Sequence, residues 1–337
     1  METIKNFFRF LFFNKTNPLS EADSFKDDLG TEKPFKPHYD KYILPHVIEF
    51  EAKRIEALKK FKSRLLIAIA LFGFLYGLLF VFVTGVKALE ALEYIIVLFF
   101  IIGRFAYQPI RKYKSSVKSI IFPKIFSFFG DNYKYNNESP LSISVFEGYE
   151  IVPYYDKAIL EDYVKGSYKE VVIEFFSANL LKKGSKGRQC RVFHGIVICL
   201  TMNKNFNGKT IVVEDAGMVN NWLKDKFSSL QVVNLEDPTF ENQFEVYSND
   251  QIEARYLLTT TFMERLLALS SMFNNQIKCS FYNKKLLFMI DRGEDTFKTS
   301  SIFLPSTFEY DIKTVLIEMQ AIFNIIDTLK LSEKTGL

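Results

Sequence analysis

Residues 65–83 read LLIAIALFGFLYGLLFVFV, a run of 19 residues without a charged side chain. About 20 apolar residues in a helix are enough to cross the hydrocarbon core of a bilayer. A buried helix of a soluble protein usually carries a polar stripe on one face, and this run carries none. The run therefore predicts a transmembrane helix at about 65–84.

A second apolar stretch, YIIVLFFIIG at 94–103, is too short to cross a membrane by itself. Extension to about 88–107 includes Glu90, Glu93 and Arg104. A charge at the centre of the bilayer costs about 2.5–3.5 kcal/mol, but these three lie near the ends, where side chains reach the headgroups. We expect a second crossing here, with a re-entrant or interfacial segment as the alternative.

Basic residues flank this expected helical hairpin. They are Lys53, Arg54, Lys59, Lys60, Lys62 and Arg64 before it, and Arg104, Arg111, Lys112, Lys114 and Lys118 after its core. Loops rich in Lys and Arg stay in the cytoplasm, so both termini are expected there. The basic flanks would also contact the anionic headgroups of the lipid bilayer. Gly73 and Gly77 form a G-x-x-x-G pair that would bring two first helices together in a homo-oligomer.

The part of the chain before the expected hairpin is predicted to contain a tail and an amphipathic helix. The start of the chain, METIKNFFRFLFFNK, has no small-residue cleavage site and is not a secretory signal. Residues 1–40 are expected to be a flexible tail, with an interfacial Phe-rich patch as the alternative for its start. Residues 41–118 would hold a basic amphipathic helix, from Pro45 to Arg64, and the hairpin. The apolar face of that helix would pack on the C-terminal domain, lie on the membrane or pair with another chain.

Residues 145–331 have the texture of a separate domain, in keeping with about two domains for 337 residues. Alternating apolar runs predict strands at 168–181, 191–202, 209–215, 244–248 and 277–291. Hairpin turns are expected at 182–190, at Asn207-Gly208 and at 283–285. Capping boxes at 248–251 and 261–264 predict two helices, which would end at Tyr256 and Met272.

The last predicted helix lies in residues 311–331. It has an apolar stripe made of Ile312, Val315, Leu316, Met319, Ile322, Phe323, Ile326 and Leu329. Such a stripe predicts that the helix covers one face of the sheet. Strands followed by helices indicate an α+β fold, here a cytosolic domain with a mostly antiparallel sheet and covering helices behind a two-helix transmembrane hairpin.

Gly208-Lys209-Thr210 is the end of a phosphate-binding loop, but the rest of that motif is missing. A glycine is required at position 203, which is Asn. The motif must also lead into a helix, whereas the β-branched TIVVED follows. We therefore expect no nucleotide. The net charge of only +4 excludes a strongly basic nucleic-acid binder.

No catalytic or metal-ligand pattern is present. Cys190, Cys199 and Cys279 have neither disulfide-framework nor metal spacing, and His194 is expected to be a packed strand residue. An acidic stretch from Asp237 to Glu253 would supply paired carboxylates or form a solvated loop. Candidate interaction residues are Asp237, Asp250, Arg255 and Tyr256; a salt bridge from Arg255 to Asp250 or Glu253 is the structural alternative. No cofactor is expected.

Several stretches together resemble a bacterial family of membrane proteins, the domain of unknown function numbered three-one-three-seven. They are ILEDYVKGSYKEVVIEF (159–175), NKNFNGKTIVV (203–213), LEDPTFENQFEVYSNDQIEARYLLTTTFMERL (235–266) and KKLLFMI (284–290). The resemblance extends over roughly 37–331, and this chain has Thr260 where the family has Pro. It implies a protein of the bacterial inner membrane, which the two expected crossings make multi-pass, and it brings no catalytic residues with it.

The expected architecture favours three possible functions, in the following order. The first is a non-catalytic interaction or sensor module, tethered at the membrane and bound to a protein partner. The alternative is a membrane-tethered enzyme acting on a lipid or peptide, which would need converging titratable groups in a polar cleft. A subunit of a transport assembly is the third, since two short helices form a pore only when several copies assemble.

Overall fold

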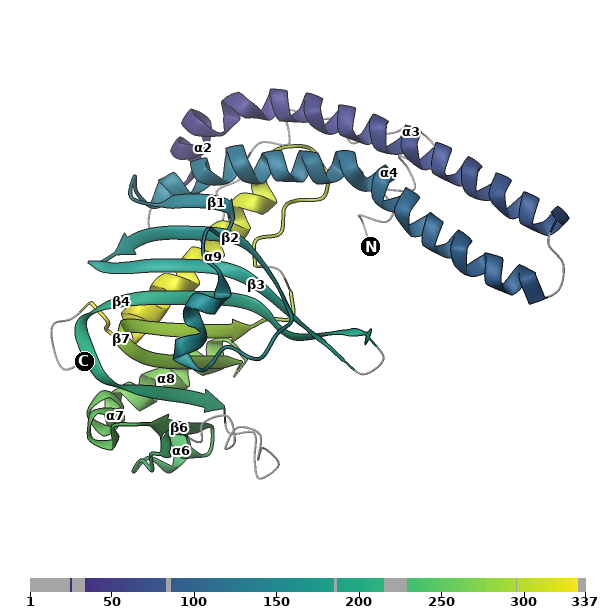
Figure 1. The fold of residues 1–337 in the computed structure, drawn as a ribbon. Helices are drawn as coiled ribbons and strands as arrows, with labels where there is room; N and C mark the ends of the chain where they lie inside the picture. Colours follow the sequence, from purple (N-terminus) through teal and green to yellow (C-terminus); the bar gives the residue numbers. More distant parts are fainter. Residues whose placement is uncertain are drawn as a thin grey trace. The chain divides into compact units, whose positions relative to one another are not determined.

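The computed structural model describes residues 25, 34–82, 86–184, 187–214, 229–274, 276–294 and 296–332 (Figure 1). Of residues 79–82, 86–96 and 203–205 only the backbone is described. The chain divides into two compact units. We name residues 1–128 with 299–313 the helical unit, and residues 129–298 with 314–337 the sheet unit. Most of the tail expected at 1–40 lies outside the described residues.

The helical unit is built on two long helices. Its described helices are α2 (Lys36–Tyr42), α3 (Leu44–Phe82) and α4 (Val86–Phe126). The helix expected from Pro45 to Arg64 is confirmed, and it continues into the apolar run as expected. α3 and α4 pack side by side, with the rings of Phe72 and Phe99 centred 5.3 Å apart.

The apolar face predicted for the start of α3 is buried inside the helical unit. Val47, Phe50, Leu58 and Phe61 are buried, while Ile55 is partly exposed. The ring of Phe50 lies 5.5 Å from that of Phe308, which belongs to the C-terminal half of the sequence. Of the three occupants expected for this face, the structure therefore shows packing within the chain.

One helix of the described residues, α3, is long and apolar enough to cross a membrane. The qualifying segment is Leu44–Leu78, with a mean hydropathy of 1.6. The second crossing expected at 88–107 is not shown. α4 is helical throughout that range, but the side chains of residues 88–96 lie outside the described ones.

The sheet unit contains one antiparallel sheet, as expected. Its described strands are β1 (Lys134–Glu138), β2 (Lys157–Tyr168), β3 (Val171–Lys183), β4 (Gln189–Glu214), β5 (Gln231–Val232), β6 (Phe244–Ser248) and β7 (Ile277–Asp291). Their order is β1-β2-β3-β4-β6-β5, and β7 pairs with the other side of β4. β3 pairs with the first half of β4 and β6 with its second half, while β7 follows both halves.

Two of the predicted hairpin turns are wrong. β4 runs through Asn207-Gly208, and β7 runs through residues 283–285 without a turn. The register shifts there, with Phe206 opposite Asn283 and Lys209 opposite Tyr282. Asn283 has a φ of 55°. Asn tolerates this left-handed conformation, which a bulge accommodates as readily as a turn, whereas Asn207 and Gly208 are not among the residues with positive φ. The turn at 182–190 is confirmed, since β3 and β4 pair across it.

The contact between β4 and β7 requires a glycine. A Cβ atom on Gly195 would lie 2.0 Å from the carbonyl oxygen of Ile290. Real Cβ atoms do not approach a backbone oxygen this closely, so a side chain at this position would push the two strands apart.

Short helices lie between the strands in the sequence. They are η2 (Ile143–Tyr149), α6 (Pro238–Glu241), α7 (Gln251–Leu257) and α8 (Thr260–Met272). The predicted caps are each displaced by two residues, because Asp250 rather than Ser248 caps α7 and Thr259 rather than Thr261 caps α8. A side chain caps a helix only where its oxygen reaches the N2 or N3 amide, which the sequence pattern alone does not fix.

The last helix, α9 (Glu309–Thr328), begins in the helical unit and continues in the sheet unit. All eight residues of the predicted stripe are buried. In the sheet unit the ring of Phe323 stacks on Tyr168 of β2 with centroids 4.2 Å apart. The helix lies across one face of the sheet, as expected (Figure 1).

Candidate functional site

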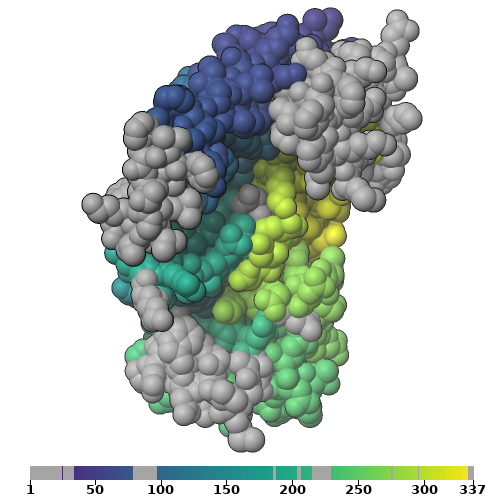
Figure 2. Space-filling view, turned by 90° about the vertical axis from the view of Figure 1, so that its right-hand side faces the viewer, coloured from purple at the N-terminus to yellow at the C-terminus, as the bar shows by residue number. Residues whose placement is uncertain are grey.

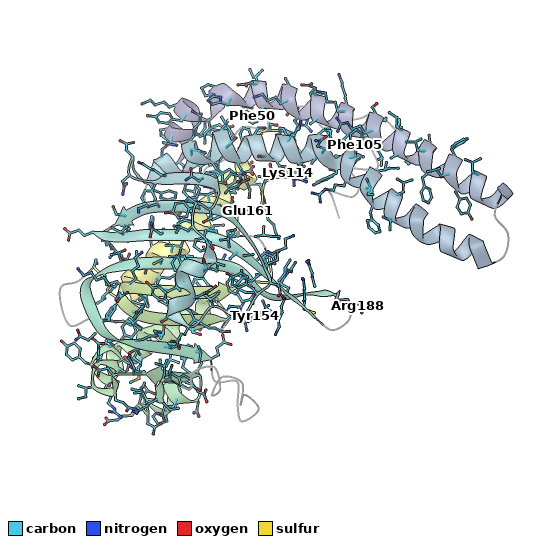
Figure 3. All side chains as sticks on the ribbon, in the orientation of Figure 1. Phe50, Phe105, Lys114, Tyr154, Glu161 and Arg188 are labelled. Atoms are coloured by element: carbon cyan, nitrogen blue, oxygen red, sulfur yellow. The ribbon has the colours of Figure 1, made fainter. Side chains whose placement is uncertain are left out.

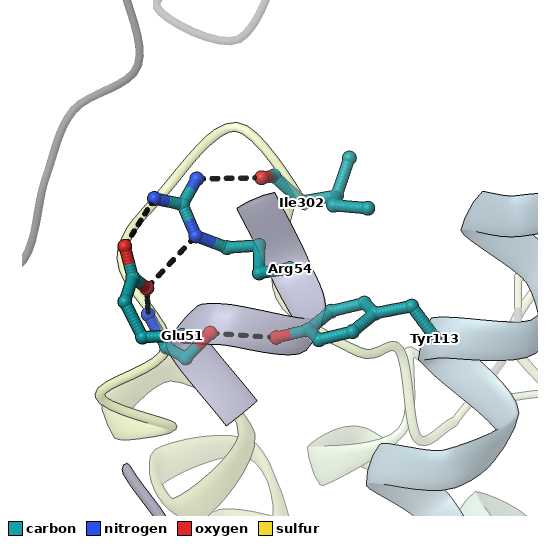
Figure 4. A network of polar contacts seen from close by, with 5 residues as sticks. Glu51, Arg54, Tyr113 and Ile302 are labelled. Atoms are coloured by element: carbon teal, nitrogen blue, oxygen red, sulfur yellow. Dashed lines mark hydrogen bonds and ion pairs between the residues drawn. The ribbon is translucent and has the colours of Figure 1, made fainter. Parts of the chain in front are cut away.

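A buried ion pair ties α3 to the C-terminal segment of the helical unit (Figure 4). Arg54 is fully buried, and its Nε and Nη2 donate to the carboxylate of Glu51 at 2.9 and 2.5 Å. Its Nη1 donates to the carbonyl oxygen of Ile302 at 2.9 Å. The expectation that Arg54 contacts headgroups is therefore wrong. Arg54 lies four residues after Phe50 and four before Leu58, so helical periodicity already places it on the buried stripe.

Further bonds extend this network to α4. The carboxylate of Glu51 accepts from the backbone N–H of Ser306 at 3.0 Å, and the hydroxyls of Ser306 and Tyr113 lie 2.7 Å apart. Burial alone would raise the pKa of Glu51, but the bonds from Arg54 and Ser306 outweigh it and hold that pKa below its usual value. The part of α3 around Glu51 and Arg54, which we name the base of α3, is thus fixed to the C-terminal segment of the helical unit by charge-assisted hydrogen bonds.

A second buried carboxyl lies at the start of α9, within the helical unit. Asp311 is completely buried and accepts from the backbone N–H of Ser300 at 2.9 Å. Burial raises the pKa of Asp311 to about 6. Burial also lowers the pKa of Lys114, which is the cation that favours the charged form of Asp311.

Beyond this base, the two long helices expose a continuous set of large apolar side chains. This apolar belt consists of Leu66, Ile67, Ile69, Leu71, Phe74, Tyr76 and Leu78 of α3 and Val97, Phe99, Phe100, Ile101, Phe105 and Tyr107 of α4. Figure 3 shows side chains standing out from both helices in the part near Phe105. An exposed apolar patch of this extent marks an interface with a membrane or a protein.

The two glycines of the first helix lie within this belt. A Cβ atom on Gly73 or Gly77 would meet nothing within 4 Å. Their surface is therefore open in the single chain. A helix–helix contact through them would need a second copy, which stays a prediction.

The four candidate interaction residues have two kinds of environment. Asp237 caps α6 by accepting from the amides of Thr239 and Phe240, and Asp250 caps α7 in the same way. Both carboxylates are thus used to begin helices. Arg255 donates to the side chain of Gln251 at 3.1 Å, in place of the expected salt bridge to Asp250 or Glu253.

The exposed side of α7 carries large apolar side chains. Ile252 is 83% exposed, and Tyr256, one turn later, is 57% exposed. Val232 of β5 is 50% exposed, and its carbonyl accepts from the side chain of Gln251 on α7 at 2.9 Å. We name Ile252, Tyr256 and Val232 the α7 face. Figure 2 shows the green segment that includes α7 and α8 at the surface. Sequence reasoning found Tyr256 but missed Ile252, although their spacing of four is typical of one helix face.

The backbone at Asn207-Gly208-Lys209 binds an internal carboxylate. The amides of Asn207 and Gly208 donate to Glu253 at 3.0 and 2.6 Å, and the amide of Lys209 donates to Asn249 at 2.7 Å. These are the donors that a phosphate would need. They are already used inside the sheet unit.

The sheet unit contains a small cavity with polar residues in its lining, which can be compared with the polar cleft that an enzyme would need. A cavity of about 80 Å³ is lined by Glu214, Lys278 and Asp291 among others. Burial raises the pKa of Glu214, whose carboxylate accepts from the amide of Ile277 at 3.0 Å. The cavity is smaller than the roughly 300–1,000 Å³ of small-molecule sites. Among the described residues no group of three His, Cys, Asp or Glu side chains would hold a metal ion.

The cysteines and His194 take structural positions. Cys190 is exposed, whereas Cys199 and Cys279 are buried and all three are free. Burial raises the pKa of Cys199 to about 11, so its thiol is not activated. His194 is buried in β4, in agreement with the expected packed strand residue.

The fold defines a mixed α/β protein with an antiparallel sheet and an apolar N-terminal helix able to cross a membrane. Residues 191–331 match the model of the family described as Protein of unknown function (DUF3137), which supports membership in that family. This confirms the resemblance over the second half of the sequence. A solved structure, that of the mycobacterial trehalose monomycolate transport factor A, is similar to 59% of this chain and 88% of its own, with 12% identity and a TM-score of 0.33. Comparison with curated proteins finds no match.

Proposed function

We propose that the protein is a non-catalytic interaction module anchored in a bacterial inner membrane. The apolar belt supports this proposal most strongly. Its residues are large and apolar, they are exposed, and they begin at Leu66, just after the basic first part of α3. In water such a surface would be costly, whereas in hydrocarbon it is favourable.

The second crossing belongs to the same proposal. The belt continues on α4 from Val97 to Tyr107, and Arg104 is the charged residue within that stretch. A hairpin of α3 and α4 returns the chain to the side from which it came. The basic flanks then place both termini and the sheet unit in the cytoplasm.

The exposed thiol of Cys190 provides a direct test of topology. A membrane-impermeant maleimide is applied to spheroplasts that express the full chain, before and after lysis, with Cys190→Ser as the control for labelling at the two buried cysteines. We expect labelling of Cys190 only after lysis. In the Cys190→Ser background, Gly85→Cys, between the two expected crossings, should be labelled in intact spheroplasts. Labelling of Cys190 in intact spheroplasts would overturn the cytoplasmic position of the sheet unit.

The α7 face is the proposed contact for a protein partner, because Ile252 and Tyr256 are exposed and adjacent on one helix. Membranes that contain the tagged full chain are crosslinked, and the wild type is compared with Ile252→Asp. Ile317→Asp is the matched control, since Ile317 of α9 is also an exposed isoleucine, at 58%. A protein captured by the wild type and by Ile317→Asp should be absent from Ile252→Asp. Equal capture by all three would exclude this face.

The alternative, a membrane-tethered enzyme, rests on the cavity beside Glu214. A partly buried carboxyl with a raised pKa is the kind of group that serves as a general acid or base. This alternative predicts that Glu214→Gln abolishes any hydrolysis of lipid or peptide found with the purified chain. Activity that survives Glu214→Gln would place the chemistry elsewhere. A transport role would require an assembly of several copies.

A further inference from the structure

A groove of about 230 Å³ lies between α3 and α4 within the helical unit, where the basic flanks meet the apolar belt. Its walls include four cationic side chains, Lys53, Lys60, Arg64 and Lys112, and one carboxylate, Glu56. We propose that this groove binds the phosphodiester headgroup of an anionic phospholipid. The inference rests on the proposed function, because it needs α3 and α4 to lie in the membrane.

Arg64 is placed in the groove by a hydrogen bond that α4 lacks at Pro109. Pro109 lies inside that helix and has no amide hydrogen, so the carbonyl oxygen of Phe105, four residues earlier, loses its helical partner. The Nη1 atom of Arg64 donates to this oxygen at 3.2 Å and to the side chain of Gln108 at 2.9 Å. The unpaired carbonyl created by the proline is thus satisfied from the neighbouring helix.

The ring of Phe105 fixes the guanidinium further. The Cζ atom of Arg64 lies 4.4 Å from the centroid of that ring, within the range of a cation–π contact. Both hydrogen bonds given above are made by Nη1. The edge of the guanidinium formed by Nε and Nη2 can therefore receive two oxygens of one phosphate, in the bidentate geometry that arginine favours.

The lysines of the groove are held by weak exposed pairs. The ammonium of Lys60 lies 2.5 Å from Glu56, and that of Lys53 lies 2.6 Å from Glu49. Each of these pairs joins residues one helical turn apart with largely exposed side chains. Such pairs contribute little to stability, so a phosphate can take the place of the carboxylate. Lys112 is exposed on α4 and adds a further cation on the opposite wall.

The position of the groove favours a lipid over a free anion. Arg64 directly precedes the apolar run, and the belt starts at Leu66 on α3 and ends at Tyr107 on α4. The groove therefore opens at the depth where lipid phosphates lie. Its volume suits a headgroup rather than a whole lipid, whose acyl chains would lie along the belt.

The test uses the purified full chain in a neutral detergent, titrated with phosphatidylglycerol or phosphatidylcholine and observed by native mass spectrometry. We expect one phosphatidylglycerol to bind at least about tenfold more tightly than phosphatidylcholine. Arg64→Gln/Lys112→Gln should remove this preference. Because loss of Arg64 also frees the carbonyl of Phe105, Lys60→Gln/Lys112→Gln serves as a second variant that keeps the Arg64 contacts, and it should weaken the preference by several-fold.

Lys59→Gln/Arg111→Gln is the matched control. It removes the same charge from exposed positions of the same two flanks that do not line the groove. Equal loss of preference in this control would overturn the site in favour of general attraction. Competition by inorganic phosphate at the concentration of the lipid would assign the groove to a free anion and overturn the lipid. If the lipid preference is absent while Cys190 is still labelled only in lysed spheroplasts, the groove proposal fails and the proposed membrane topology stands. The two proposals can therefore fail separately.

Discussion

Replacement of Arg54 by methionine tests whether the buried network fixes α3 in the helical unit. Methionine keeps much of the length of the side chain and removes the guanidinium. The change deletes the two bonds to Glu51 and the 2.9 Å bond to the carbonyl of Ile302. Of the hydrogen bonds described above, Glu51, which is 8% exposed in the wild type, then keeps the 3.0 Å bond from the amide of Ser306.

Removal of one partner from a buried ion pair costs about 3–5 kcal/mol, because the other charge stays buried without compensation. We therefore expect Arg54→Met to lower the free energy of unfolding of the helical unit by about 3–5 kcal/mol. In a unit of this size 1 kcal/mol lowers Tm by about 2–4 °C, so the expected loss is about 6–20 °C.

Thermal unfolding of the detergent-solubilised full chain, followed by far-UV circular dichroism, measures this loss. Lys53→Met is the control, since its partner Glu49 is exposed and its charge is screened by solvent. The double variant Glu51→Gln/Arg54→Met should lose less than the sum of the two single variants, because each single change leaves the other partner buried and unpaired.

The pH dependence has a definite sign. The pKa of Glu51 is lower in the folded chain than in the unfolded one. The charged Glu51 therefore stabilises the folded chain above the unfolded pKa, near 4.3, and this stabilisation is lost as the pH falls through the folded pKa. The gap between wild type and Arg54→Met should therefore narrow below about pH 4. A loss equal to that of Lys53→Met, or a strictly additive double variant, would refute the reasoning.

Three further predictions concern other parts of the chain. Gly195→Ala should destabilise the sheet unit by about 1–3 kcal/mol or more, because its Cβ would lie 2.0 Å from the oxygen of Ile290; an unchanged denaturation midpoint would contradict this. Glu253→Ala should cost about 1–3 kcal/mol, since the amides of Asn207 and Gly208 lose their charged acceptor, and hydrogen exchange at those amides should rise. As the pH rises from about 4 to 6, the free energy of unfolding of the wild type should fall by up to about 3 kcal/mol relative to that of Asp311→Asn, because the pKa of Asp311 is raised in the folded chain. A difference between the two proteins that does not change with pH would contradict this prediction.

The candidate site residues show where local patterns fail. Asp237 and Asp250 stand in an acidic stretch that suggests binding, yet their carboxylates cap helices. Arg54 stands in a basic flank that suggests headgroup contact, yet it is buried against Glu51. In both cases the partner atoms decide the role, and composition does not identify those atoms.

The groove between α3 and α4 was only partly accessible to sequence reasoning. The basic flanks and their position beside an apolar run are visible in the sequence. The contact of Arg64 with the carbonyl that Pro109 leaves unpaired joins residues 41 positions apart, and it exists because the two helices pack antiparallel. A proline within a helical pattern indicates an unpaired carbonyl, but it does not say which side chain will satisfy it.

Periodicity by itself determined the long elements of this protein. The eight-residue stripe of the last helix and the continuous helix from the basic flank into the apolar run follow from the spacing of apolar side chains, and the antiparallel sheet follows from the order of strands and helices. Tertiary structure alone decided that β4 passes straight through Asn207-Gly208. The amides there are held by Glu253 and Asn249, and β7 pairs along both halves of the strand. Asn-Gly is a local turn signal, but Asn207 and Gly208 are not among the residues with positive φ, and whether the chain turns there depends on which distant groups bind its amides.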